Sequence, residues 1–188
     1  VWGSLQSAWA LEQERLNKQG HSVWHLQNHN LQAWGLTLLL FGALVAWLGW
    51  VALPFLLVQA VYASSMLEVV NYVEHYGLLR QRDASGRYVR CEPEHSWNSN
   101  HLVGNLLLYQ LQRHSDHHAH PSRRYQALRH FATAPQLPAG YATMITVAYL
   151  PPLWFAWMDR RVMAHYRGDL GLVNVQASAR RRLTQRWG

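Results

Sequence analysis

A histidine-rich stretch, "LQRHSDHHAHPSRRY" (111–125), contains the residues best suited to chemistry. On an α-helix His114, His117 and His118 fall at i, i+3 and i+4, so they share one face within about 100°. Three imidazoles on one face can bind a transition metal, for which neutral imidazole is a suitable ligand. His120 lies about 120° from this face and is expected to end the helix just before Pro121. Taken alone, the stretch also fits a solvated loop without metal.

A second polar group lies at the end of a long apolar run, in "LEVVNYVEHYGLL" (67–79). Glu68, Asn71 and His75 share one face of a helix there. Ionisable groups at membrane depth are costly to bury, so they indicate a functional site. The alternative is that Glu74 and His75 only reach the membrane–water interface. Polar residues that could line or brace the site are Glu68, Asn71, Glu74, His95, Asn98, His101 and, as an acceptor for a ligand histidine, Asp116.

The elements that must position these groups are apolar helices. Residues 4–19 show an amphipathic helical pattern. No Asp, Glu, Lys or Arg occurs from Gln19 to Leu67, and residues 31–50 and 51–70 each approach the ~20 residues needed to cross a bilayer. Gly49 and Pro54 flank the expected turn between them. The sequence predicts a two-span membrane hairpin.

Charge sets the orientation of this hairpin. Basic residues lie on both flanks: Arg15, Lys18, Arg80, Arg82, Arg87 and Arg90. The positive-inside rule therefore places both ends in the cytoplasm. The net charge of +7 fits a membrane surface or an acidic protein. Nucleic-acid binding is not expected, because the arginines follow membrane spans and no nucleic-acid-binding module is present.

A second charge-free run, Phe131 to Met158, contains several prolines and is expected to cap the domain or lie against the membrane. The single Cys91 excludes an internal disulfide and a CxxC zinc knuckle. The predicted fold is an all-α, integral membrane helical bundle fragment with a cytoplasmic histidine-rich region. Its expected parts are a pre-membrane segment (1–30), a transmembrane hairpin (31–72), a site region (73–130) and an apolar capping segment with a basic tail (131–188).

The motifs "NYVEHYGLLR" and "LQRHSDHHAHPSRRY" behind a membrane hairpin resemble the bacterial membrane alkane 1-monooxygenases. These belong to the histidine-box di-iron superfamily, which includes membrane fatty acid desaturases and hydroxylases. HxxHH is shared across that superfamily, whereas NYxEHYGL together with LQRHSDHHA is more specific. The resemblance extends over essentially the whole chain.

The resemblance implies that His75, His114, His117 and His118 are metal ligands in a centre of two non-haem irons. It implies terminal hydroxylation of medium- or long-chain n-alkanes by O2, giving primary alcohols. Electrons would come from rubredoxin and an NAD(P)H-dependent rubredoxin reductase. The location would be the bacterial inner membrane, with the metal on its cytoplasmic side.

The HELxHK-type and EHxxGHH-type boxes that supply the family's other ligands do not occur in the sequence. We therefore expect this chain to be the C-terminal part of a longer enzyme and to be inactive alone. Alternatives are another histidine-box enzyme, such as a desaturase or a xylene-type methyl hydroxylase, and a non-catalytic module that binds zinc. Candidate residues for docking the acidic rubredoxin are Arg123, Arg124 and Arg129; alternatively, these arginines only contact lipid or fix the topology.

Overall fold

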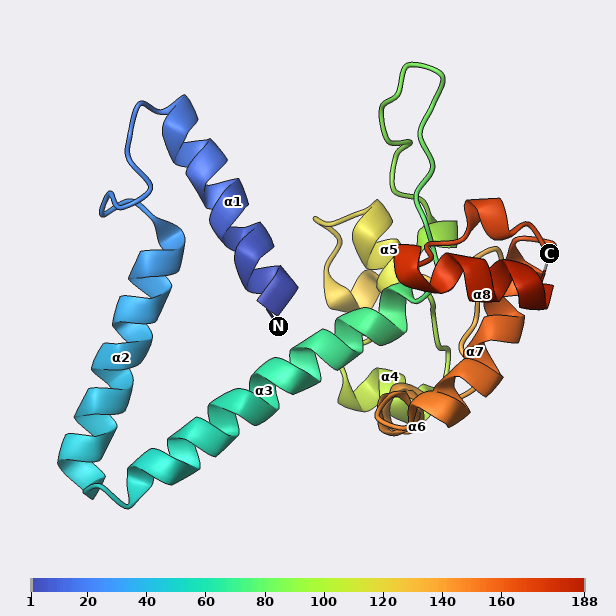
Figure 1. The fold of residues 1–188 in the computed structure, drawn as a ribbon. Coiled ribbons are helices and arrows are strands. Elements are labelled where there is room, and N and C mark those ends of the chain that lie inside the picture. Colours follow the sequence, from blue (N-terminus) through green and yellow to red (C-terminus); the bar gives the residue numbers. More distant parts are fainter. Residues whose placement is uncertain (1, 188) are drawn as a thin grey trace. The chain divides into compact units, whose positions relative to one another are not determined.

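The computed structural model describes residues 2–187. Within that range it contains eight α-helices and no β-strand, which confirms the predicted all-α class. The helices are α1 (Trp2–Lys18), α2 (His29–Leu48), α3 (Ala52–His75), α4 (Leu102–Leu107), α5 (His114–Ala119), α6 (Tyr141–Ala148), α7 (Pro151–His165) and α8 (Ala177–Trp187) (Figure 1). Three short 3₁₀ helices cover Pro93–His95, Tyr125–Ala127 and Leu170–Leu172. The chain forms two compact units, residues 1–68 and residues 69–188.

The first unit is organised around the buried carboxylate of Glu12. This carboxylate accepts hydrogen bonds from the Arg15 side chain (2.8 Å) and from the backbone N–H of His29 (2.6 Å). Asn28 caps α2, because its side chain accepts from the N–H groups of Asn30 and Leu31. This cap explains why α2 begins at His29, slightly before the predicted span.

Helices α2 and α3 are both long and apolar enough to cross a membrane. Apolar side chains along both remain exposed, for example Leu38 (74%) and Val61 (72%). Exposed apolar side chains on such helices are what lipid contact requires. The turn between them uses Gly49 at a positive φ of 83°, and Pro54 lies in the first turn of α3, as predicted.

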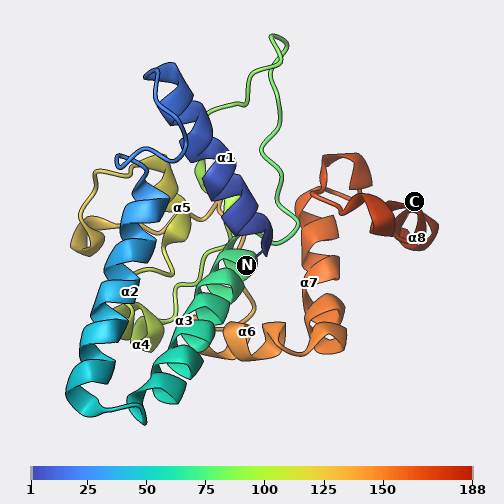
Figure 2. The ribbon, with the colours of Figure 1, turned by 60° about the vertical axis from the view of Figure 1, so that its left-hand side comes forward.

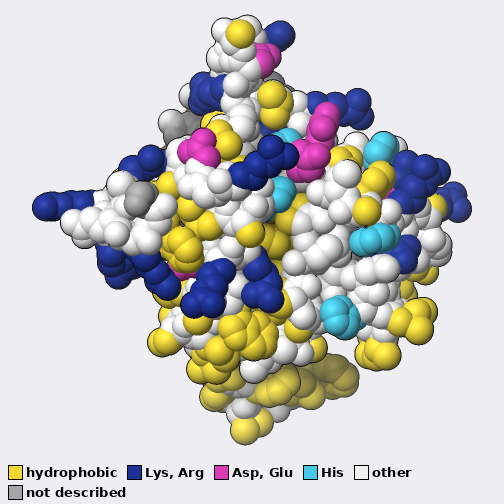
Figure 3. All heavy atoms as spheres, turned by 90° about the vertical axis from the view of Figure 1, so that its right-hand side faces the viewer, with side chains coloured by type: hydrophobic (Ala, Val, Ile, Leu, Met, Phe, Trp, Pro, Cys, Tyr) yellow, Lys and Arg dark blue, Asp and Glu magenta, His cyan; other side chains and the backbone are white. Residues whose placement is uncertain are grey.

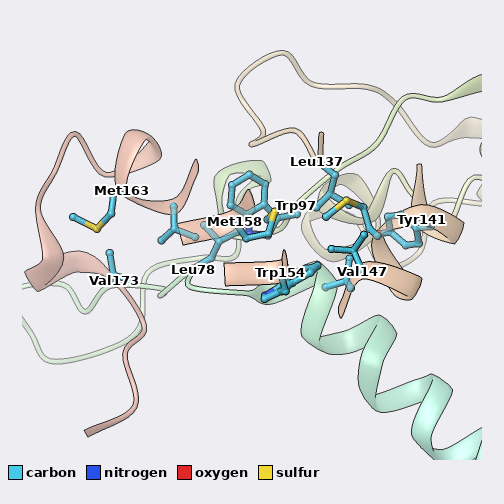
Figure 4. Close-up of a cluster of buried hydrophobic side chains, with 12 residues drawn as sticks. Leu78, Trp97, Leu137, Tyr141, Val147, Trp154, Met158, Met163 and Val173 are labelled. Carbon is cyan, nitrogen blue, oxygen red and sulfur yellow. The ribbon is translucent and has the colours of Figure 1, made fainter. Parts of the chain in front are cut away.

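The second unit has one hydrophobic core, to which α3, α6 and α7 all contribute (Figure 4). Its fully buried members include Trp97, Tyr141, Met144, Trp154 and Met158. Helices α6 and α7 follow each other closely along the chain, with a sharp change of direction (Figure 2). The run 131–158, expected to cap the domain or lie against the membrane, therefore supplies much of the interior of this unit.

A buried extended segment, residues 96–99, connects the elements of this unit; we call it the central segment. The N–H of Trp97 donates to the carbonyl of Glu74 at the end of α3 (2.8 Å). The N–H of Ser99 donates to the carbonyl of Gln112 just before α5 (2.9 Å). Asn98 pairs with the loop before α6, since its N–H donates to the carbonyl of Pro135 (2.8 Å). The central segment thus fixes α3, α5 and α6 relative to one another.

Two further segments of this unit are rich in arginine. Residues 79–92 form a projecting loop (Figure 1), closed by a bridge between Arg82 and Tyr88. The guanidinium groups of Arg80 and Arg82 lie over the Tyr88 ring, 5.1 and 4.5 Å from its centroid. The basic tail is helical as α8, with Ala179, Leu183 and Trp187 half-buried along one face.

Replacing Asn98 by Ala is expected to destabilise the second unit by about 2 kcal/mol. The Asn98 side chain is 1% exposed; it accepts from the N–H of Ser115 (3.0 Å) and donates to its hydroxyl (2.6 Å). Removing it leaves buried polar groups of Ser115 without partners. The thermal unfolding midpoint should fall, while Asn100→Ala, at an exposed position, should leave it nearly unchanged. Equal midpoints for the two variants would contradict this role of Asn98.

Candidate metal centre

Three histidines of the second unit converge on one point: His75, His114 and His118, which we call the histidine cluster. His75 is the last residue of α3, and the other two lie on α5. The Nε2 of His114 lies 3.2 Å from that of His75 and 2.8 Å from that of His118. Metal–nitrogen bonds of about 2.1 Å place adjacent octahedral ligands about 3.0 Å apart, and tetrahedral ligands about 3.4 Å apart. The Nε2 of His114 is therefore close enough to the other two nitrogens for neighbouring ligands of one metal ion, and all three ligand atoms lie within 4.8 Å of one another.

The short helix α5 presents its histidines because both of its ends are held. Near its start, Ser115 is fixed by the side chain of Asn98. At its end, His120 is the C-cap, in agreement with the predicted stop before Pro121. Within this helix His114 faces inward and is 7% exposed, whereas His117 and His118 are exposed. Two of the three histidines predicted to share a face, His114 and His118, converge with His75.

Burial keeps the inner histidine neutral. Burial, and then the proximity of His118, His75 and His117, lowers the pKa of His114 to about 2. Burial and the neighbouring imidazoles of His75 and His117 also lower the pKa of His118. Neutral imidazole is the form that binds a metal ion. Burial therefore favours the protonation state of His114 and His118 that metal binding requires.

Glu74 lies behind His114, on the side away from the convergence point. Its Oε1 is 3.3 Å from the Nδ1 of His114, and Glu74 is 4% exposed. The hydroxyl of Tyr141 donates to the same oxygen at 3.0 Å. His114 Nδ1 has no well-aligned hydrogen bond, so a buried donor and a buried acceptor lie next to each other. A carboxylate at the second nitrogen is the usual companion of a metal-binding histidine.

His117, the fourth predicted ligand, lies beside the cluster. Its ring centroid is 5.8 Å from that of His118 and 6.2 Å from that of His114. Its ligand role therefore stays a prediction.

The side-chain hydrogen bonds of Asp116 go to residues other than the predicted ligands. Its fully buried carboxylate accepts from His120 Nδ1 (2.9 Å), from Arg123 (2.6 Å) and from the backbone N–H of Arg129 (2.7 Å). Burial alone would raise the pKa of Asp116, but these hydrogen bonds outweigh it and lower the pKa. Asp116 therefore holds the loop after α5 in place.

The other predicted polar residues are dispersed around the site. His95 is half-buried, and its backbone interacts with the ring of His75. His101 is exposed and hydrogen-bonds the hydroxyl of Ser99 (2.8 Å). Asn98 braces α5 through Ser115. Glu68 belongs to the first unit, where it lines a small hollow with Ser4 and Leu67.

A cavity of about 760 Å³ begins beside His75 and Asn71. Helices α7 and α8 close it, and most of its walls are apolar, among them Tyr72, Phe155 and Leu183. Figure 3 shows the face that carries these helices, with apolar side chains exposed between groups of basic ones. The sequence did not indicate this cavity, because α7 and α8 meet α3 only in the folded unit.

Residues 1–148 match the family model for fatty acid desaturases. The chain belongs to the fatty acid desaturase family. The whole chain aligns with the alkane 1-monooxygenase of Acinetobacter baylyi at 50% identity and covers 46% of that protein. With alkane 1-monooxygenase 2 of Pseudomonas aeruginosa the identity is 53%, and the alignment covers 87% of this chain and 43% of the relative. With the xylene/toluene monooxygenase hydroxylase component of Pseudomonas putida the identity is 34%, and the alignment covers 82% of this chain and 40% of the relative.

The chain therefore spans less than half the length of these curated relatives. The predicted resemblance to alkane 1-monooxygenases is confirmed. The donor set of this desaturase-family site fits a transition metal such as iron, because three imidazole nitrogens converge and a buried carboxylate lies behind one of them.

The stability of the metal-free protein should decrease as the pH falls. The pKa of His114 is lowered to about 2 on folding, so unfolding at acidic pH allows this residue to take up a proton. Stability is therefore present above the unfolded pKa of about 6.5 and lost as the pH falls below it. Lowering the pH from about 7.5 to about 5.5 should cost about 1 kcal/mol from this residue.

Thermal unfolding of the iron-free whole protein across this pH range measures the effect. His114→Gln should flatten the pH dependence, since the titrating group is removed. An equally steep dependence in that variant would show that other groups cause it.

Proposed function

We propose that the whole protein hydroxylates n-alkanes of medium or long chain at the terminal methyl, giving primary alcohols. The observation that carries this proposal is the convergence of His75, His114 and His118 in a chain 50% identical to an alkane 1-monooxygenase along its full length. The site lies at the end of an apolar helix long enough to cross a membrane, where hydrocarbon substrates dissolve.

We assign the metal as iron, with two non-haem ions in the whole protein. His75, His114 and His118 would hold it, with His117 next to them. Bound iron would supply the activation of O2, which side chains alone do not provide. Four histidines cannot saturate two irons, so further ligands would come from parts of the whole protein outside this chain.

The residues of this chain would position the metal and the substrate and exclude water from the site. Val73 and Trp97 are buried next to the site and keep water from the inner side of the cluster. Most side chains of α3 are apolar, which suits a hydrocarbon without a polar handle. Selectivity for alkanes would then rest on shape and on partition from the bilayer.

A second candidate is a methyl hydroxylase acting on an aromatic substrate. The 34% identity to the xylene/toluene monooxygenase component supports it, but the alkane relatives are considerably more similar. A structural zinc site is less favoured, because relatives that match most of this chain are named monooxygenases, and zinc has no redox chemistry with which to activate O2.

We place the site on the cytoplasmic side of the bacterial inner membrane, with rubredoxin and its NAD(P)H-dependent reductase as electron donors. Arg124 and Arg129 have exposed side chains near α5 and could attract an acidic protein. Arg123 is less available, since it forms an ion pair with the buried Asp116. The basic projecting loop 79–92 supports a cytoplasmic position by the positive-inside rule.

Replacing His114 or His118 by Ala in the whole protein should lower the iron content and reduce alkane hydroxylation at least about a hundredfold. Loss of a hydrogen-bond partner of a ligand already costs about ten- to a hundredfold, and loss of the ligand itself should cost more. Iron per protein and octanol formed from octane measure the two effects. His130→Ala, at an exposed position outside the cluster, is the matched control and should stay near wild type. Full iron occupancy with wild-type turnover in His118→Ala would refute the proposed metal centre.

Reversing charge at Arg124 and Arg129 together, each to Glu, should raise the Michaelis constant for rubredoxin several-fold and change the turnover number little. Electrostatic attraction speeds encounter and weakens as salt shortens the Debye length to about 8 Å. The wild-type constant should therefore rise with salt, and the variant should respond less. A constant that responds neither to salt nor to the double reversal would assign these arginines to the membrane surface instead.

A further inference from the structure

We propose that Tyr141 is a positioning residue for the metal site: it holds Glu74, which in turn orients the ligand His114. This inference rests on the proposed metal centre. It assigns a role to a residue of α6, a helix that carries no ligand and that lies outside both histidine motifs.

The three side chains form one buried chain of contacts. The Tyr141 hydroxyl donates to Glu74 Oε1 at 3.0 Å, and the same oxygen is 3.3 Å from His114 Nδ1. Tyr141, Glu74 and His114 are 1%, 4% and 7% exposed. Water therefore has little access to the carboxylate, and a buried carboxylate requires protein partners. Tyr141 provides one partner and the imidazole of His114 is placed to provide the other.

The orientation of His114 makes the carboxylate useful. The Nε2 of His114 faces the rings of His75 and His118, so its Nδ1 must point toward Glu74. An acceptor at Nδ1 favours the tautomer with its proton there, which leaves the Nε2 lone pair for the metal. The carboxylate can perform this task only while Oε1 stays in place, and the Tyr141 hydroxyl is the donor that holds it.

Tyr141 can act as a fixed donor because it is itself held. Its backbone N–H donates to Oε1 of Gln112 at 2.9 Å, and Gln112 is fully buried. The carbonyl of Gln112 accepts from Ser99 of the central segment. Burial and the charge of Glu74 raise the pKa of Tyr141 well above its ordinary value, so the hydroxyl keeps its proton. The donor is therefore tied through Gln112 to the segment that leads into α5.

The test measures iron affinity in the whole protein by competition with a chelator. Tyr141→Phe keeps the ring and removes the hydroxyl, and should weaken iron binding about tenfold or more, as loss of an outer hydrogen-bond partner does. Glu74→Gln should weaken it at least as much. The double variant should be no worse than Glu74→Gln alone, because Tyr141 acts through the carboxylate.

Tyr166→Phe is the matched control. Its hydroxyl accepts a hydrogen bond from the N–H of Leu79 (3.0 Å) and serves the same unit without touching Glu74. This variant should unfold at a lower temperature but bind iron with wild-type affinity. Thermal unfolding of the iron-free proteins separates a general loss of stability from a specific loss of metal binding.

Wild-type iron affinity in Tyr141→Phe would overturn the inference, and so would strictly additive losses in the double variant. A loss of affinity in Tyr166→Phe equal to that in Tyr141→Phe would also overturn it, because any weakening of the unit would then suffice. The proposed metal centre is tested separately by His114→Ala. Unchanged iron binding in that variant would refute the centre itself, whereas lost binding there with normal Tyr141→Phe refutes only the role of Tyr141.

Discussion

The pairing of the central segment with both ligand-bearing elements is the constraint on which the site depends. The histidines come from the end of α3 and from α5, two helices that are distant in sequence. Backbone hydrogen bonds from Trp97 to Glu74 and from Ser99 to Gln112 set their relative position, and Asn98 fixes Ser115 beside the inner ligand. These bonds are buried, so breaking one costs more than it would at the surface. The arrangement of the histidine cluster therefore rests on main-chain pairing in a segment that contributes no histidine to it.

Burial acts on this site in two ways. It keeps the inner imidazole neutral, by lowering the pKa of His114, and so maintains a nitrogen that can bind metal. It also leaves the carboxylate of Glu74 dependent on protein donors. Under the proposed role of Tyr141, metal binding at this site depends on the hydrogen-bond donors that hold Glu74. Iron binding and the packing of α6 are for this reason expected to be coupled.

The sequence predicted the parts of the fold and site that depend on local periodicity. The two apolar helices and the turn at Gly49 follow from local sequence patterns, and the structure contains them. The spacing of the HxxHH triplet also predicted that its histidines share a helical face, and the structure brings His114 and His118 together. It did not predict Tyr141 or Gln112, because their roles arise from packing between segments far apart in the chain. Asp116 illustrates the same limit. Its spacing allowed an interaction with a ligand, but the loop after α5 brings Arg123 and the Arg129 backbone to it instead.

Because His75 is the last residue of α3, the length of this helix sets how far His75 lies from the turn at Gly49. Its 24 residues extend about 36 Å at ~1.5 Å per residue, somewhat more than the ~30 Å hydrocarbon layer. A helix slightly longer than the layer fits by tilting. One residue added between the turn and Glu68 would lengthen the helix between the turn and His75 by about 1.5 Å. The second unit would still hold His75 beside His114 and His118. The number of residues in α3, and not only their apolar character, therefore sets the distance along this helix from the turn to the histidine cluster.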